Sequence, residues 1–65
     1  MKVQYFQDTD TLYIEFKAAG IAQSKDLDEN IILDLDRDGN IFGITLEHAS
    51  QRADIPRFSY EQIPA

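Results

Sequence analysis

The chain has no cysteine, and this absence removes two of the usual ways of stabilising a very small domain. Neither a disulfide framework nor a zinc site built on thiolates is available to its 65 residues. A chain of this length buries only about 60% of the surface that its unfolded form exposes, so we expect one domain with a marginal core. Self-association is the remaining common remedy. We therefore predict a homo-oligomer, a dimer or larger.

Basic residues are also scarce. Six Lys and Arg stand against twelve Asp and Glu, which gives a formal charge of −6. Nucleic-acid phosphates and anionic membrane surfaces would repel such a chain, so we expect neither as a partner, whereas a basic protein is favoured. Long apolar runs and an apolar leader segment are missing as well, which predicts a cytoplasmic protein. Hydrophobic residues still make up 43%, too many for intrinsic disorder.

Short polar clusters recur about every ten residues, the spacing of an antiparallel β-meander of about five strands. The clusters are residues 7–11, 17–20, 26–30 and 37–40. After Glu47 the pattern fits a short helix over residues 48–53, and Pro56 cannot lie far inside a regular element. We predict a single mainly β or α+β domain over residues 1–65. Residues 1–47 form the meander, and residues 48–65 form a short helix and an aromatic-containing tail.

The first hairpin is predicted to turn at Asp8-Thr9. This turn pairs apolar residues on one face and opposite charges on the other. The predicted pairs are Tyr5 with Leu12, Val3 with Ile14, and Lys2 with Glu15. Residues 21–27 carry little apolar surface, so this segment is predicted to lie at a sheet edge or to be irregular.

The last hairpin is predicted to turn at Asp38-Gly39, because glycine can adopt the positive φ of a tight turn. This turn sets six apolar side chains on one face, and Asp34 and Asp36 project from the other, solvent-facing side. The predicted apolar pairs are Leu35 with Phe42, Leu33 with Ile44, and Ile31 with Leu46.

Four motifs together resemble one known family. They are D-T-L-Y-I at residues 10–14, I-I-L-D-L-D at residues 31–36, D-G-N-I-F-G-I at residues 38–44, and Ala49-Ser50. Over about residues 3–50 the chain is similar to the domain-of-unknown-function 2283 family of small prokaryotic proteins. The resemblance implies a β-rich fold and a bacterial or archaeal origin, and it transfers no catalytic residues. Thr45 stands where the family commonly has Glu, and the tail from Phe58 matches no family pattern.

Residues 34–41 match the first eight positions of a calcium-binding loop. Asp34, Asp36 and Asp38 stand at positions 1, 3 and 5, and Gly39 stands at position 6. Position 12, where a bidentate Glu completes the shell, is Thr45. A β-hairpin explains the same residues, and we favour it. A calcium-dependent structural module is the alternative reading.

His48 is the only histidine and a candidate general base. Glu47 or Asp54 could orient it, but the three serines, Ser24, Ser50 and Ser59, form no triad-like spacing. A chain of this size is also too small to enclose a large ligand pocket. We expect no catalytic residues and no cofactor, and a small enzyme is the third reading.

Two groups of residues indicate protein contacts. Six carboxylates between Asp26 and Asp38, Asp34 and Asp36 among them, form either a solvated acidic surface or a docking surface for a basic protein. Phe58, Tyr60 and Ile63 in the tail pack either on the chain's own sheet or on a second subunit. We predict a self-associating protein-interaction or regulatory module. An antitoxin-like inhibitor is one such module, and some members of the family named above are thought to be encoded beside small toxin-like proteins.

Overall fold

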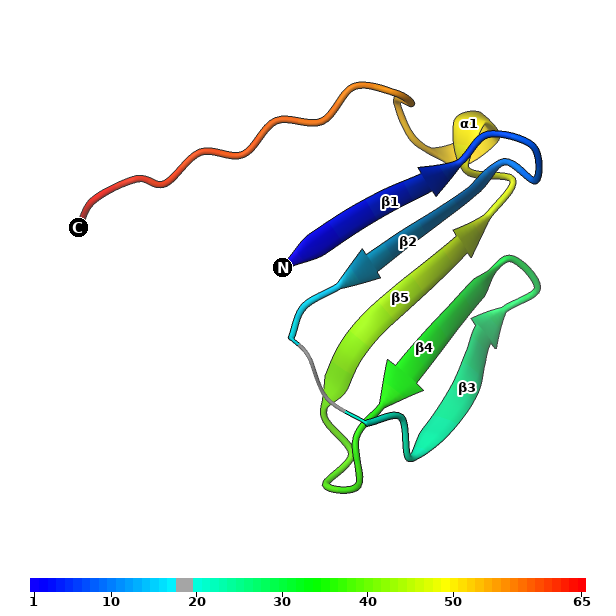
Figure 1. Cartoon of the computed structure of the whole chain (residues 1–65), viewed down its shortest axis with the longest axis vertical. Coiled ribbons are helices and arrows are strands. Elements are labelled where there is room, and N and C mark those ends of the chain that lie inside the picture. Colours follow the sequence, from blue (N-terminus) through cyan, green and yellow to red (C-terminus); the bar gives the residue numbers. More distant parts are fainter. Residues whose placement is uncertain (18–19) are drawn as a thin grey trace.

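The computed structural model describes residues 1–17 and 20–65, so residues 18 and 19 of the predicted 17–20 polar cluster lie outside it. Within the described residues five strands form one antiparallel sheet, followed by one short helix (Figure 1). The elements are β1 (Lys2–Phe6), β2 (Thr11–Glu15), β3 (Gln23–Asp28), β4 (Ile31–Leu35), β5 (Ile41–Glu47) and α1 (Ala49–Arg52). The predicted fold class, mainly β with a short helix near the C-terminus, is confirmed.

The order of strands across the sheet is β1-β2-β5-β4-β3. In a meander each strand pairs with the next one in the sequence. The pairs β1–β2, β3–β4 and β4–β5 follow this rule, but β2 pairs with β5 instead of β3. This order gives the apolar strand β5 an apolar neighbour on each side and leaves the polar strand β3 with one neighbour. All six residues of β3 are exposed, as an edge strand predicts.

The first hairpin has the predicted register in full, with Tyr5 opposite Leu12, Val3 opposite Ile14 and Lys2 opposite Glu15. Because β2 also pairs with β5, these apolar pairs extend across the sheet as two rows. The rows are Val3–Ile14–Ile44–Leu33 and Tyr5–Leu12–Leu46–Ile31. We call the side of the sheet that carries these eight residues the apolar face.

The last hairpin differs from the predicted two-residue turn. Asp36 and Asn40 pair through their backbones, so the loop has three residues, and its last residue, Gly39, has a φ of 84°. The longer loop shifts the register by one, which places Leu35 opposite Ile41 instead of Phe42. A bulge in β5 then shifts the register back. The predicted pairs Leu33–Ile44 and Ile31–Leu46 are therefore confirmed.

The core is small. Among the described residues only Phe42 and Ala49 are buried hydrophobic residues, at 2% and 0% exposure. The eight residues of the apolar face are all half-buried. A single sheet with no second layer over most of one apolar face accounts for this pattern.

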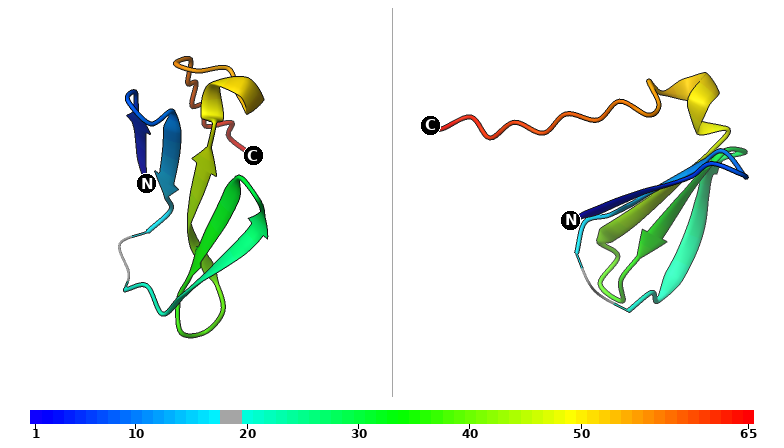
Figure 2. Two further views of the ribbon diagram at one scale, coloured as in Figure 1. Left: turned by 90° about the vertical axis from the view of Figure 1, so that its right-hand side faces the viewer. Right: turned by 45° about the horizontal axis from the view of Figure 1, so that its top comes forward.

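Beyond α1 the chain turns back over one end of the apolar face and then departs from it. In Figures 1 and 2 the last residues form an extended arm that leaves the sheet on the side of β1. α1 itself, four residues long and placed as predicted, is too short to cross a membrane, and no other helix occurs in the described chain.

Candidate protein-interaction surface

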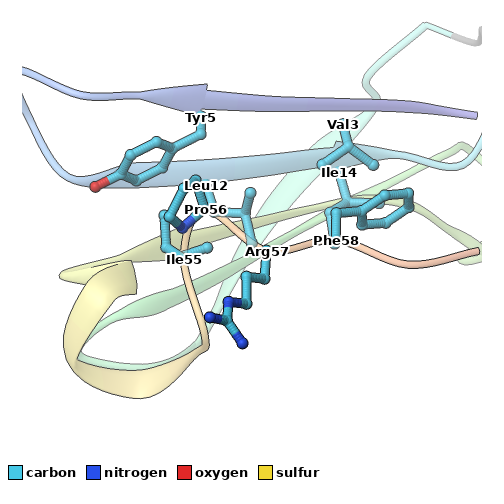
Figure 3. A pocket seen from close by; sticks show the side chains of 8 residues that line it. All are labelled: Val3, Tyr5, Leu12, Ile14, Ile55, Pro56, Arg57 and Phe58. Atoms are coloured by element: carbon cyan, nitrogen blue, oxygen red, sulfur yellow. The ribbon is translucent and has the colours of Figure 1, made fainter.

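A cavity of about 290 Å³ lies between the apolar face and the first residues after α1. Ile55, Pro56 and Phe58 approach the sheet from one side, as Figure 3 shows. The opposite wall consists of the β1 and β2 ends of the two apolar rows: Val3, Tyr5, Leu12 and Ile14. The lining is mainly apolar, with Tyr5 and Arg57 as its polar side chains, so the cavity offers shape and hydrophobic surface and few groups for chemistry.

A second cavity, of about 530 Å³, continues the first toward the start of β1. Met1 and Val3 line it on the sheet side, and Phe58 and Tyr60 line it on the tail side. Val3 and Phe58 belong to both cavities, so the two form one apolar groove between sheet and tail. We call it the tail groove.

Two of the three predicted tail anchors, Phe58 and Tyr60, line this groove, and Ile63 is not among its lining residues. Phe58, Tyr60 and Ile63 are 64%, 73% and 77% exposed. The sequence left two packing arrangements open, on the chain's own sheet or on a second subunit. In a single copy of the chain, the sheet does not bury these three side chains. The anchors remain available to another molecule.

Asp34 does not project into solvent, and that prediction is wrong. Its side chain is buried at 7% exposure, where Ser24 Oγ donates to Oδ1 at 2.9 Å and Tyr13 Oη lies 3.5 Å from Oδ2. The physical reason is that β3 and β2 supply polar partners on this side of the sheet, so the carboxylate is buried with hydrogen bonds. Burial of Tyr13, together with the charge of Asp34, raises the pKa of the Tyr13 hydroxyl.

Asp36 organises the β4–β5 loop. Its Oδ1 accepts the backbone N–H groups of Asp38 and Asn40, each at 2.9 Å, and Lys17 Nζ lies 3.1 Å from Oδ2. The Asn40 N–H makes the largest contribution to lowering the pKa of the Asp36 carboxyl, and Lys17 also lowers it. In the part of the chain that the structure describes, no three acidic or histidine side chains gather in a way that could hold a metal ion.

Asp10 connects the β1–β2 turn to α1. Its Oδ1 accepts the Tyr5 hydroxyl at 2.6 Å and the Ser50 N–H at 3.0 Å, and its Oδ2 accepts the Ser50 hydroxyl at 2.8 Å. Its own carbonyl accepts the Ala49 N–H at 2.9 Å. The hydrogen bond from Tyr5 makes the largest contribution to lowering the pKa of the Asp10 carboxyl, and the bond from the Ser50 hydroxyl makes the next. The Tyr5–Asp10 bond also raises the pKa of the Tyr5 hydroxyl.

His48 stands at the N-cap of α1 with a φ of 54° and an exposed side chain. Its charge contributes to the lowered pKa of Asp10, which belongs to the structural link with Ser50. Of the two predicted orienting partners, Glu47 precedes it in β5 and Asp54 follows α1, and neither hydrogen-bonds to it in the described chain. Among the described residues, Ser50 donates its hydroxyl to Asp10, and the His48 side chain forms no hydrogen bond with a serine or a carboxylate.

Acidic side chains remain accessible at the β3 edge. Asp26, Asp28 and Glu29 are exposed along β3 and the turn that follows it, although Asp28 also contacts Arg52 at 3.4 Å. Asp38 is exposed on the β4–β5 loop. Of the six predicted carboxylates, the fold engages three internally: Asp34, Asp36, and Asp28, whose Oδ1 accepts the Asn30 N–H at 2.7 Å.

Sequence reasoning missed Ile55 and Pro56 as groove residues. An isolated Ile-Pro pair after a predicted helix gives no indication of which surface it will meet. Asp10 and Ser50 both lie in the motifs that resemble the family, which was the only indication of their importance in the sequence. Forty residues separate them, and only the fold shows that they are in contact.

Comparisons with known proteins give one match. No curated protein and no solved structure matches the chain. The family model described as "Protein of unknown function (DUF2283)" matches residues 2–50, which comprise the whole sheet and the start of α1 and exclude the tail. The chain therefore belongs to the DUF2283 family.

Proposed function

We propose that this protein is a protein-interaction module that self-associates through its apolar face and the adjoining tail. The observation that carries the proposal is an excess of exposed surface. The chain exposes 5194 Å², whereas the scaling for compact monomers gives about 4,250 Å² at this mass. The excess, about 950 Å², is similar to the roughly 800 Å² that each partner buries in a stable interface of standard size.

The dimensions of the chain agree with this surface excess. Its radius of gyration is 12.9 Å, compared with about 10.7 Å for a compact domain of the same length. Part of the difference is the extended tail, and part is the uncovered sheet. An apolar sheet face that no second layer covers is typical of binding sites on soluble proteins.

Light scattering after size exclusion tests self-association directly. We expect the untagged chain at about 100 μM to elute as a dimer or a larger species, in the presence of calcium and of chelator alike. A monomer under these conditions would contradict the proposal. Dissociation on dilution would give the affinity.

The regulatory partner that we propose is a basic protein, with antitoxin-like inhibition as one form of the interaction. Asp26, Asp28 and Glu29 support this partner, because they lie along an exposed edge strand whose free backbone groups can also accept an added strand. Opposite charge would speed association and make it sensitive to salt.

A lysine-rich peptide serves as the probe for the acidic edge. We expect its binding to weaken with added salt and to be lost in an Asp26→Lys/Glu29→Lys variant. An Asp8→Lys/Asp54→Lys variant has the same change in charge at exposed positions away from β3 and is the matched control. Equal loss in both variants would mean that net charge alone, and not this edge, attracts the peptide.

A further inference from the structure

The tail after Arg57 has the properties of a strand without a partner. Figures 1 and 2 show it extended and clear of the sheet. Within residues 1–17 and 20–65, no hydrogen bond involves the backbone of residues 58–65. Its three large apolar side chains, Phe58, Tyr60 and Ile63, are each at least 64% exposed. Such a segment offers both backbone groups and apolar surface to another extended chain.

The tail sequence is self-complementary about Ser59. If two copies run antiparallel with Ser59 opposite Ser59, opposite charges meet and aromatic rings meet. The resulting pairs are Arg57 with Glu61 and Phe58 with Tyr60. Each pair occurs twice, because a twofold axis makes every contact between unlike residues reciprocal.

We propose that two copies of this chain associate by antiparallel pairing of residues 57–61 across a twofold axis at Ser59. The inference rests on the proposed self-association and names the segment that carries it. It concerns residues beyond the family match at 2–50.

Two hydrogen bonds at the start of the tail limit the segment that can pair. The N–H groups of Ile55 and Arg57 donate to the carbonyl oxygens of Ala53 and Asp54 in the same chain, at 3.1 and 3.0 Å, and residues 55–56 form a turn, so an extended segment begins at Arg57. Alternate residues of an antiparallel strand direct their N–H groups toward the partner. The Arg57 N–H belongs to the set that points away from the partner when Phe58 and Tyr60 form the hydrogen-bonded pair.

The side chains agree as well. Phe58 and Tyr60 are two residues apart in an extended segment and line the same cavity, so they share one side of the tail. In the paired arrangement the second copy's Tyr60 lies beside Phe58 on that side. The aromatic pair then closes the tail groove over Met1 and Val3, the part of the apolar surface at the start of β1. Pairing therefore covers the tail and the sheet together.

Cysteine cross-linking tests the register, because the natural chain contains no cysteine. At a non-hydrogen-bonded pair the two Cα atoms are about 4.5 Å apart, within the range that a disulfide spans. We expect Ser59→Cys to form a disulfide dimer under mild oxidation. Ile63→Cys is the matched control on the same tail. Its twofold mate lies about 27 Å away along the strand, so cross-linking should be at least about tenfold slower.

The outcomes separate this inference from the proposed function. A Ser59→Cys dimer with little Ile63→Cys dimer supports the antiparallel register. Equal cross-linking at both sites indicates parallel pairing or random collision and overturns it. If light scattering shows a dimer of the natural chain and Ser59→Cys does not cross-link, tail pairing is wrong and self-association stands. If the natural chain is a monomer, both are wrong.

Charge exchange provides an independent test. Arg57→Glu alone and Glu61→Arg alone each place like charges opposite one another twice, and we expect each to weaken dimerisation by roughly tenfold. Mixing these two variants restores both opposite-charge pairs in a heterodimer, and the double variant Arg57→Glu/Glu61→Arg restores them in a homodimer. Arg37→Glu, an exposed position on the β4–β5 loop, is the control for net charge. Failure of the mixed variants to associate better than either alone would contradict the pairing.

Discussion

Asp10 and Ser50 are joined by two hydrogen bonds, from the Ser50 N–H at 3.0 Å and from its hydroxyl at 2.8 Å, both to the Asp10 carboxylate. The Ser50 N–H lies in the first turn of α1, where backbone donors have no partner within the helix. The carboxylate thus caps a helix from the opposite end of the sequence. It attaches α1, and the tail that follows it, to the β1–β2 hairpin.

Removing either member of this pair should lower the melting temperature. Asp10→Ala leaves the Ser50 donors and the Tyr5 hydroxyl without an acceptor, and Ser50→Ala removes one of the bonds. We expect Asp10→Ala to have the larger effect and the double variant to be less destabilised than the sum of the two single variants. Thermal unfolding followed by circular dichroism measures all three. If the destabilisation of the double variant equals the sum of those of the two single variants, the contact between Asp10 and Ser50 contributes nothing to stability.

Stability should fall in acid. The carboxyls of Asp10, Asp28 and Asp36 have pKa values below the ordinary 3.8, chiefly through hydrogen bonds from Tyr5, Asn30 and Asn40 respectively. Groups whose pKa is lowered on folding contribute stability that is present above 3.8, and this stability is lost as the pH falls below it. Melting temperatures measured from pH 7 down to pH 2 should decline below about pH 4. Asp10→Asn should flatten that decline, and Asp8→Asn, an exposed neighbour in the same turn, should leave it unchanged.

Gly43 should not tolerate a side chain. A Cβ at this position would lie 2.8 Å from Tyr13 Oη and 3.3 Å from the Ile14 carbonyl oxygen. Alanine would therefore displace the Tyr13 ring from Asp34 or push β5 from β2, at a cost of about 1–3 kcal/mol. Chemical denaturation of Gly43→Ala measures this loss. Gly20→Ala is the control, because a Cβ at Gly20 meets nothing within 4 Å, and a loss of equal size there would contradict the steric explanation.

Calcium should leave the protein unchanged. The Asp36 carboxylate already accepts two backbone N–H groups and contacts Lys17, while Asp34 is turned toward Ser24 and Tyr13. Binding would have to break these contacts. We expect the same melting temperature in millimolar calcium and in chelator, whereas Asp36→Ala lowers it in both. A rise of the melting temperature in calcium would instead support the alternative reading, a calcium-dependent structural module.

The sequence by itself determined the strands and one of the two hairpin registers. Alternation of apolar and polar residues around Asp8-Thr9 leaves a single register that pairs Val3 with Ile14 and Tyr5 with Leu12, because a slip by one residue would turn every apolar side chain to the opposite face. The same requirement explains the β4–β5 hairpin. Its loop is one residue longer than predicted, and a bulge in β5 restores the pairing of Leu33 with Ile44.

Only the tertiary structure decided the rest, because it depends on contacts between segments far apart in the chain. The position of β5 between β2 and β4, the burial of Asp34 against Ser24 and Tyr13, and the link from Asp10 to Ser50 have no local signal. The tail is the clearest case. Its sequence marked Phe58, Tyr60 and Ile63 as anchors, but whether they pack on their own sheet depends on where α1 releases the chain. The fold leaves all three largely exposed, since the sheet that they would cover ends beside the path of the tail.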